Sequence, residues 1–228
     1  MPARFRRIGV LAGLCFLVAW RVPTTVESGH LPQQPDRLQR LAAEAKRKGQ
    51  TSATFSLAGD NSGVGTNPAE IFNYFSFVVA RPLDREPITT ADNGRINSWV
   101  AVEVTRTVSL VARESTACVR DSAPSALRLA GPQEHGVSMS GGTYVVDGIT
   151  ITQTGYDVEP RLEPGSQYLL MVVACPGKVM MLPYEGLSVF KVGQDGRLST
   201  DHGLRRPFID AILSLGTVDA VAAYLKKR

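Results

Sequence analysis

Cysteine and histidine are the first residues to consider, because they supply most nucleophiles and metal ligands. The three histidines, His30, His135 and His202, are widely separated, and none belongs to a His-Glu-x-x-His or Cys-x-x-Cys motif. Cys118 and His135 could form a thiolate–imidazolium pair, the nucleophile of many cysteine enzymes. We favour a different pairing, a disulfide between Cys118 and Cys175, because of the compartment that the N-terminus predicts.

Two segments contain serine among glycines. Residues 59–65 (GDNSGVG) carry Ser62, but the order Gly-Asp-Ser-Gly is missing and no His–Asp pair stands out to activate the hydroxyl. The oxygens of Asp60, Asn61 and Ser62 could bind calcium, although the twelve-residue ligand pattern is missing. Residues 136–140 (GVSMS) lack the last glycine of a nucleophile elbow. The sequence therefore predicts no catalytic, cofactor-binding or metal-ligating residue and no cofactor.

The N-terminus has the organisation of a targeting segment. Three arginines (Arg4, Arg6 and Arg7) precede an uninterrupted apolar run, Ile8–Trp20. This run fits the hydrophobic region of a signal peptide and is shorter than the roughly 20 residues that span a bilayer. Residues 1–25 are therefore predicted to be a signal peptide or an uncleaved membrane anchor, formed as a helix. Residues 26–35, polar and proline-containing, are predicted to be a linker.

The net positive charge of the chain comes from this predicted targeting segment. Four of the 25 basic residues lie within residues 1–25, which contain no acid, so 21 basic residues face 21 acidic ones in the remainder. A neutral domain has no overall field that would attract phosphates, so nucleic acid is not an expected partner. A membrane is an expected partner only through the N-terminal segment, if that segment is not cleaved.

Export also determines how we interpret the cysteines. Cys15 lies in the targeting segment, which leaves Cys118 and Cys175 as a lone pair in an oxidising compartment. A disulfide between them is the simplest interpretation, and two unpaired thiols are the alternative. The protein is accordingly expected to be periplasmic or extracellular, or anchored to the cytoplasmic membrane by residues 8–20.

The remaining sequence, residues 36–228, is predicted to be a single mostly β domain. Helices are expected at residues 36–48, 68–73, 208–215 and from 217 to the end, and strands at 51–57, 74–80, 96–111, 143–152, 167–174, 178–182, 187–192 and 196–199. The segment 143–152 is a hairpin around Asp147-Gly148, whose two-residue loop pairs Val146 with Ile149. Arg106 interrupts the apolar face of its strand and predicts either a bulge or a strand that emerges from the core at that point. Residues 112–140 are expected to be irregular.

Short strands separated by turns, with helices near the ends of the domain, are typical of a small antiparallel barrel or sandwich. A five- or six-stranded barrel of the OB-like kind is our first choice.

Several segments resemble a family of uncharacterised exported bacterial proteins. They are YFSFVVARP, WVAVEVTRTVS, GGTYVVDGITIT, EPGSQYLLMV and GLSVFKVGQDGRL, with the helix RLAAEAKRKGQ before them. The resemblance implies export and a β domain, and it implies no activity or site residue.

The sequence thus predicts a non-enzymatic binding or interaction module of the cell envelope, which binds an unknown protein or another envelope ligand. Its long loops, 83–98 and 112–140, would make the contacts. Two alternatives are an envelope hydrolase with a site assembled from dispersed residues, and an OB-like inhibitor of proteases.

Overall fold

The computed structural model describes residues 36–56, 68–92, 94–111, 118, 123–154 and 162–227. These residues all belong to one unit of the chain, Pro35–Arg228, which is distinct from Met1–Gln34. The predicted targeting helix, the linker and the loop 59–65 lie outside the described residues. Within the described part of the chain, no helix is both long enough and apolar enough to span a bilayer.

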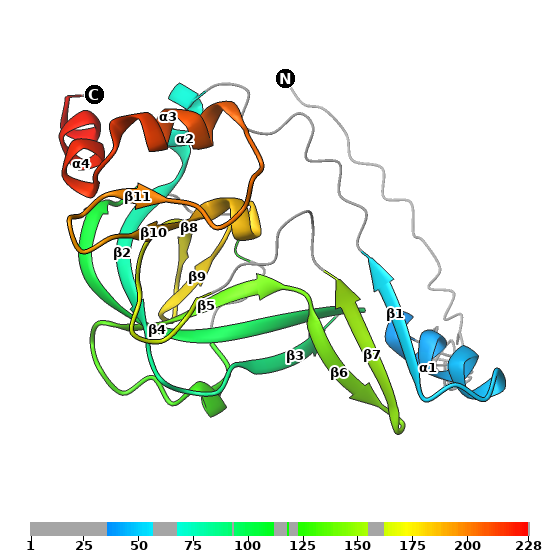
Figure 1. Cartoon of the computed structure of the whole chain (residues 1–228). Coiled ribbons are helices and arrows are strands. Elements are labelled where there is room, and N and C mark those ends of the chain that lie inside the picture. Colours follow the sequence, from blue (N-terminus) through cyan, green and yellow to red (C-terminus); the bar gives the residue numbers. More distant parts are fainter. Residues whose placement is uncertain are drawn as a thin grey trace, which may run out of the picture. The chain divides into compact units, whose positions relative to one another are not determined.

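Five strands close into a barrel, in the order β2-β4-β5-β9-β8 and back to β2 (Figure 1). The pair β5–β9 is parallel and the other barrel pairs are antiparallel. The predicted small barrel is therefore confirmed, with the five strands of an OB-like barrel. The strands are β2 (Ser76–Pro82), β4 (Arg95–Ser109), β5 (Glu134–Ser140), β8 (Gln167–Cys175) and β9 (Val179–Met181).

The alternation of side chains along each strand fills the barrel. Val78 and Ala80 of β2 pack inside it, as do Leu170 of β8 and Val137 of β5. All are at most 1 % exposed, so the interior is a packed core. Phe77 and Val79 of β2 and Leu169 and Met171 of β8 point outward and are also buried, so other elements cover this part of the outside of the barrel.

A layer of helices covers β2, β8 and β10 (Val189–Val192). It consists of α2 (Pro68–Tyr74), α3 (Pro207–Leu215) and α4 (Val218–Lys226), which lie together over one side of the barrel (Figure 1). Phe77, Met171 and Phe190 from the strands form a single apolar cluster with Ile209 and Val221 from the helices. The short strand β11 (Leu198–Ser199) pairs with β10 at the edge of the sheet.

A three-stranded sheet and the first helix form a second apolar layer. β1 (Ser52–Ser56) runs parallel to β7 (Ile149–Thr154), and β7 pairs antiparallel with β6 (Gly142–Val146). The apolar face of α1 (Arg37–Arg47) packs on this sheet. The Gln153 side chain joins the sheet to the barrel, because its Oε1 accepts the N–H of Ile96 at 2.7 Å.

The Asp147-Gly148 hairpin has the predicted register. Val146 pairs with Ile149 and Tyr144 with Ile151, while Thr143 pairs with Thr152 on the other face. Asp147 and Gly148 have φ angles of 50° and 78°, as a type I′ turn requires.

The predicted bulge near Arg106 is confirmed. The pairing of β4 with β2 shifts twice, once between Phe77 and Val78 and once between Val79 and Ala80. Arg106 leaves the apolar face as a result, and its Nη1 lies 2.6 Å from Oδ1 of Asp219 on α4.

Three details of the predicted elements are wrong. The segment 112–140 ends in a barrel strand, β5, and the polar loop after β2 contains β3 (Ile88–Asp92), which pairs with β4. Leu110, expected within the strand 96–111, lies one residue beyond the end of β4 and is 66 % exposed.

Candidate functional site

The two cysteines of the domain are bonded. Cys118 and Cys175 form a disulfide across 57 residues of sequence, with their Cα atoms 5.7 Å apart. The predicted bridge is confirmed, and a bonded sulfur excludes the alternative thiolate at Cys118. Because Cys175 ends β8, the bridge attaches the excursion after β4 to the turn between β8 and β9.

The two histidines of the described residues lie on different elements. His135 is on β5, and its Nδ1 lies 3.0 Å from the carbonyl oxygen of Gln133. His202 lies between β11 and α3, where burial lowers its pKa against smaller opposing effects of Leu204 and Asp201. No group of three His, Cys, Asp or Glu side chains in the described part of the chain could hold a metal ion.

The structure joins the two loops that the sequence predicts as contact loops. Arg85 belongs to the first loop, and both ends of its guanidinium meet the Glu134 carboxylate, at 3.0 and 3.1 Å. The same guanidinium donates to the carbonyl oxygens of Leu127 and Arg128, at 3.3 and 3.0 Å. A single arginine therefore holds the backbone of the second loop at residues 127 and 128, a contact that was not predicted from the sequence.

Glu134 is an equally important part of this contact. Its Oε2 also accepts the backbone N–H of Ala130 at 2.9 Å. These hydrogen bonds, with the one from Arg85 the strongest, hold the pKa of the Glu134 carboxyl below its usual value. The carboxylate consequently stays ionised at neutral and mildly acidic pH, and the contact with Arg85 persists.

Gly136 of β5 leaves space for residues 123–127 of the second loop to pack against the strand. A Cβ at this position would be 2.9 Å from both Cβ of Ala123 and Cδ2 of Leu127. Only glycine therefore allows the segment 123–127 to approach β5 so closely. Leu127 is 2 % exposed and packs in one cluster with Trp99 and Val179.

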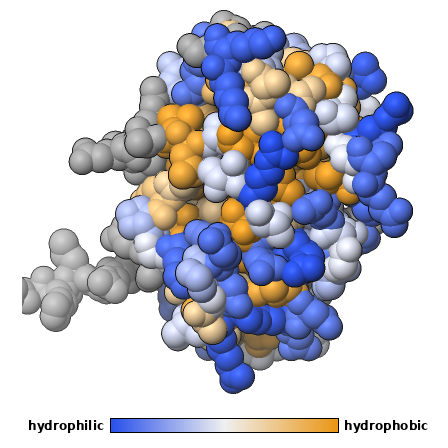
Figure 2. Space-filling model, turned by 90° about the vertical axis from the view of Figure 1, so that its left-hand side faces the viewer, coloured by the Kyte–Doolittle hydropathy of each residue, from blue (hydrophilic) through white to orange (hydrophobic). Residues whose placement is uncertain are grey.

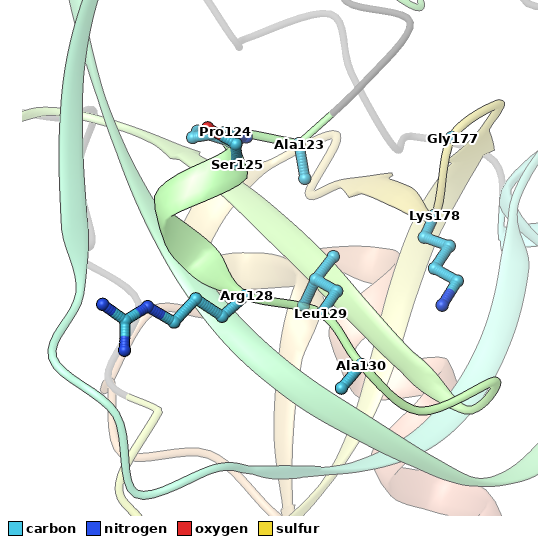
Figure 3. Close-up of a pocket in the computed structure, with 8 residues that line it drawn as sticks. All are labelled: Ala123, Pro124, Ser125, Arg128, Leu129, Ala130, Gly177 and Lys178. Atoms are coloured by element: carbon cyan, nitrogen blue, oxygen red, sulfur yellow. The ribbon is translucent and has the colours of Figure 1, made fainter.

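A depression of about 510 Å³ opens between this loop and the turn between β8 and β9 (Figure 3). One wall is made by residues 123–125 and 128–130, and the other is the turn that contains Gly177 and Lys178. Ala123 and Leu129 point toward the open space in Figure 3, whereas the side chain of Arg128 extends away on the outer side. We call this depression, lined by residues 123–130 and 177–178, the loop site.

Both charged side chains that line the loop site are basic. The Lys178 ammonium donates to the carbonyl oxygen of Gly131 at 2.8 Å, which uses one of its three protons. Arg128 is exposed and adopts a left-handed backbone conformation with φ of 51°. The loop site therefore combines apolar contact area with positive charge.

A second depression of about 570 Å³ lies over β2 and β4, and it is more polar. Its charges already have partners: Arg81 meets Glu103 at 2.6 Å, and Arg106 meets Asp219 at the same distance. In the view of Figure 2, hydrophobic residues show in several places between hydrophilic ones. The loop site is the better candidate because its basic groups are not neutralised by an acid in its lining.

Comparison with known proteins gives no assignment: no family model matches the chain, and neither a curated protein nor a solved structure matches it significantly. The resemblance to uncharacterised exported bacterial proteins stays a prediction.

Proposed function

We propose that this protein is an exported binding module of the cell envelope, and that its loop site binds an acidic segment of a partner protein. The proposal rests on one observation: contacts within the protein hold both walls of the loop site in place. Arg85 fixes one wall through two backbone carbonyls, and the Cys118–Cys175 disulfide attaches the excursion to the other. A surface that is already ordered loses less conformational entropy when it binds.

The acidic nature of the ligand is inferred from charge complementarity. Lys178 and Arg128 line the site, and its lining contains no carboxylate. Two protons of the Lys178 ammonium are available for a ligand, and hydrogen bonds from a cation to a carboxylate are stronger than neutral ones. Ala123 and Leu129 offer apolar contact beside these charges.

Size and position support the same proposal. The volume of about 510 Å³ lies within the range of about 300–1,000 Å³ found for ligand pockets. The site uses the turn between the fourth and fifth barrel strands, and Arg85 comes from the connection between the first and second. OB-like barrels commonly place their ligands at these two connections, which is support by analogy of fold alone.

Export is the part of the proposal that rests on residues 1–25. The disulfide is compatible with an oxidising compartment, where such bonds persist. The three arginines followed by Ile8–Trp20 supply the targeting signal.

The test is selection of peptides from a displayed random library on the oxidised protein. We expect the enriched peptides to contain Asp or Glu next to an apolar residue, and to bind at least about tenfold more weakly when the acid is replaced by its amide. Lys178→Gln, measured by fluorescence anisotropy, should weaken binding, and Arg128→Gln should weaken it less, because the Arg128 side chain extends away from the open space. The matched control Lys227→Gln removes an exposed charge just after the end of α4 and should leave binding unchanged.

The proposal is wrong if the enriched peptides lack acidic residues, or if Arg128→Gln and Lys178→Gln both bind them as well as the wild-type protein does. Thermal unfolding of each variant identifies a loss of binding that comes from a loss of fold.

A further inference from the structure

The exposed side of α1 carries a second, independent concentration of positive charge. Residues 36–48 contain five bases and two acids. Leu38, Ala42 and Ala45 are at most 2 % exposed and bury one face of the helix, and the basic residues lie on the remaining surface. Arg40 and Arg47 are seven residues apart, which places them on one side of the helix, about 10 Å apart along its axis.

Most of these bases have no acidic partner. Glu44 forms an ion pair with Lys48 at 2.6 Å, which lowers the pKa of the Glu44 carboxyl. The guanidinium of Arg37 lies 4.4 Å from the centre of the Phe55 ring. Arg40, Lys46 and Arg47 are exposed and make no ion pair with any residue that the structure describes.

The position of α1 in the chain points to what this surface binds. It is the first described element, and 16 residues separate it from Trp20, the end of the apolar run. At no more than about 3.6 Å per residue, those residues reach at most about 60 Å. In a chain whose apolar run stays in a bilayer, α1 therefore stays within about 60 Å of that surface, which keeps its effective concentration at the lipid headgroups high.

We propose that the basic surface of α1, formed by Arg40, Lys46 and Arg47, binds the surface of a bilayer that contains anionic phospholipid. The attraction is between guanidinium or ammonium groups and lipid phosphates, and it needs no pocket. It orients the domain with α1 toward the membrane. This surface is separate from the loop site, so either proposal can fail without the other.

The test is sedimentation of the purified chain with vesicles, at about 0.15 M salt. One set of vesicles contains zwitterionic lipid only, and the other contains about one-third anionic phospholipid. The double variant Arg40→Gln/Arg47→Gln is compared with Lys226→Gln/Lys227→Gln, which removes the same charge from the end of α4. The apolar run is identical in all these proteins, so its contribution cancels.

We expect Arg40→Gln/Arg47→Gln to lower the partition coefficient on anionic vesicles about 25-fold, or about fivefold for each arginine. The α4 variant should stay within about twofold of the wild-type protein, and zwitterionic vesicles should show no difference among the three proteins. Equal losses in both double variants would show a general effect of net charge and overturn the proposal. Binding of the wild-type protein that does not depend on anionic lipid would overturn it too.

Discussion

Breaking the disulfide should cost much of the stability of the domain. Cys118 and Cys175 are separated by 57 residues, and closing a loop of that length restricts the unfolded chain by about 4 kcal/mol on the chain-entropy account. With a urea dependence of about 2 kcal/mol per molar, the unfolding midpoint of the double variant Cys118→Ser/Cys175→Ser should fall by about 2 M. The assay is the fluorescence of Trp99, a fully buried residue of the barrel.

The controls separate this effect from others. Cys15→Ser removes a cysteine outside the domain and should leave the midpoint unchanged. The wild-type protein treated with a reductant should unfold at the midpoint of the double variant. The reasoning is refuted if the oxidised wild-type protein and the double variant unfold within about 0.3 M of each other, because the loop entropy would then be offset or absent.

Three further predictions concern the loop site and the half-buried His202. Gly136→Ala should destabilise the protein by about 1–3 kcal/mol in urea unfolding, because the new Cβ would overlap the loop that lies on β5. The control Gly203→Ala should be neutral, because a Cβ at that position has no atom within 4 Å. Arg85→Ala should speed amide hydrogen exchange in residues 123–130, because it removes the hydrogen bonds to two carbonyl oxygens there. The control Arg81→Ala, which breaks an ion pair with Glu103, should leave this exchange unchanged. Equal exchange rates in the two variants would contradict the role given to Arg85. Burial lowers the pKa of His202 in the folded protein below its value of about 6.5 in the unfolded chain. At a pH between these two pKa values, the unfolded state binds more protons than the folded state. Thermal stability should therefore fall as pH drops from about 7.5 to 5.5, and His202→Gln should reduce that fall; an unchanged pH dependence would contradict it.

Local patterns in the sequence predict much of the fold. The Asp147-Gly148 turn sets the register of its hairpin because a two-residue loop allows few alternatives. Gly49, with φ of 68°, ends α1 where it was expected to. Gly165 has φ of 81°, and the N–H of Ser166 donates to the carbonyl oxygen of Glu163, as the type II turn favoured by the sequence Glu-Pro-Gly-Ser requires.

Contacts between distant residues are not predictable in this way. The parallel pairing of β1 with β7 and the closure of the barrel by β5 and β9 join segments that no local pattern connects. β5 was missed because its histidine, glycine and serines weaken the strand pattern, although Val137 and Met139 alternate correctly for the barrel interior.

The loop site itself could be predicted only in outline. Loops 83–98 and 112–140 were expected to make contacts, and the cysteines were expected to pair. The four-way contact of Arg85 with Glu134 and two carbonyls depends on backbone positions that only the folded barrel creates. An arginine in a polar loop gives no sequence signal that separates such a role from solvation.

The most direct test of the account is the oxidation state of the cysteines in the protein taken from its native cells. Cells are lysed in the presence of an alkylating reagent, and the chain from the envelope fraction is analysed by mass spectrometry. We predict that Cys118 and Cys175 remain unmodified until a reductant is added, because the fold joins them and the proposed export would place them in an oxidising compartment. The contradicting result is protein that is recovered from the cytosol with both cysteines alkylated before any reductant is added. It would contradict both the proposed export and the attachment of the loop site by the disulfide.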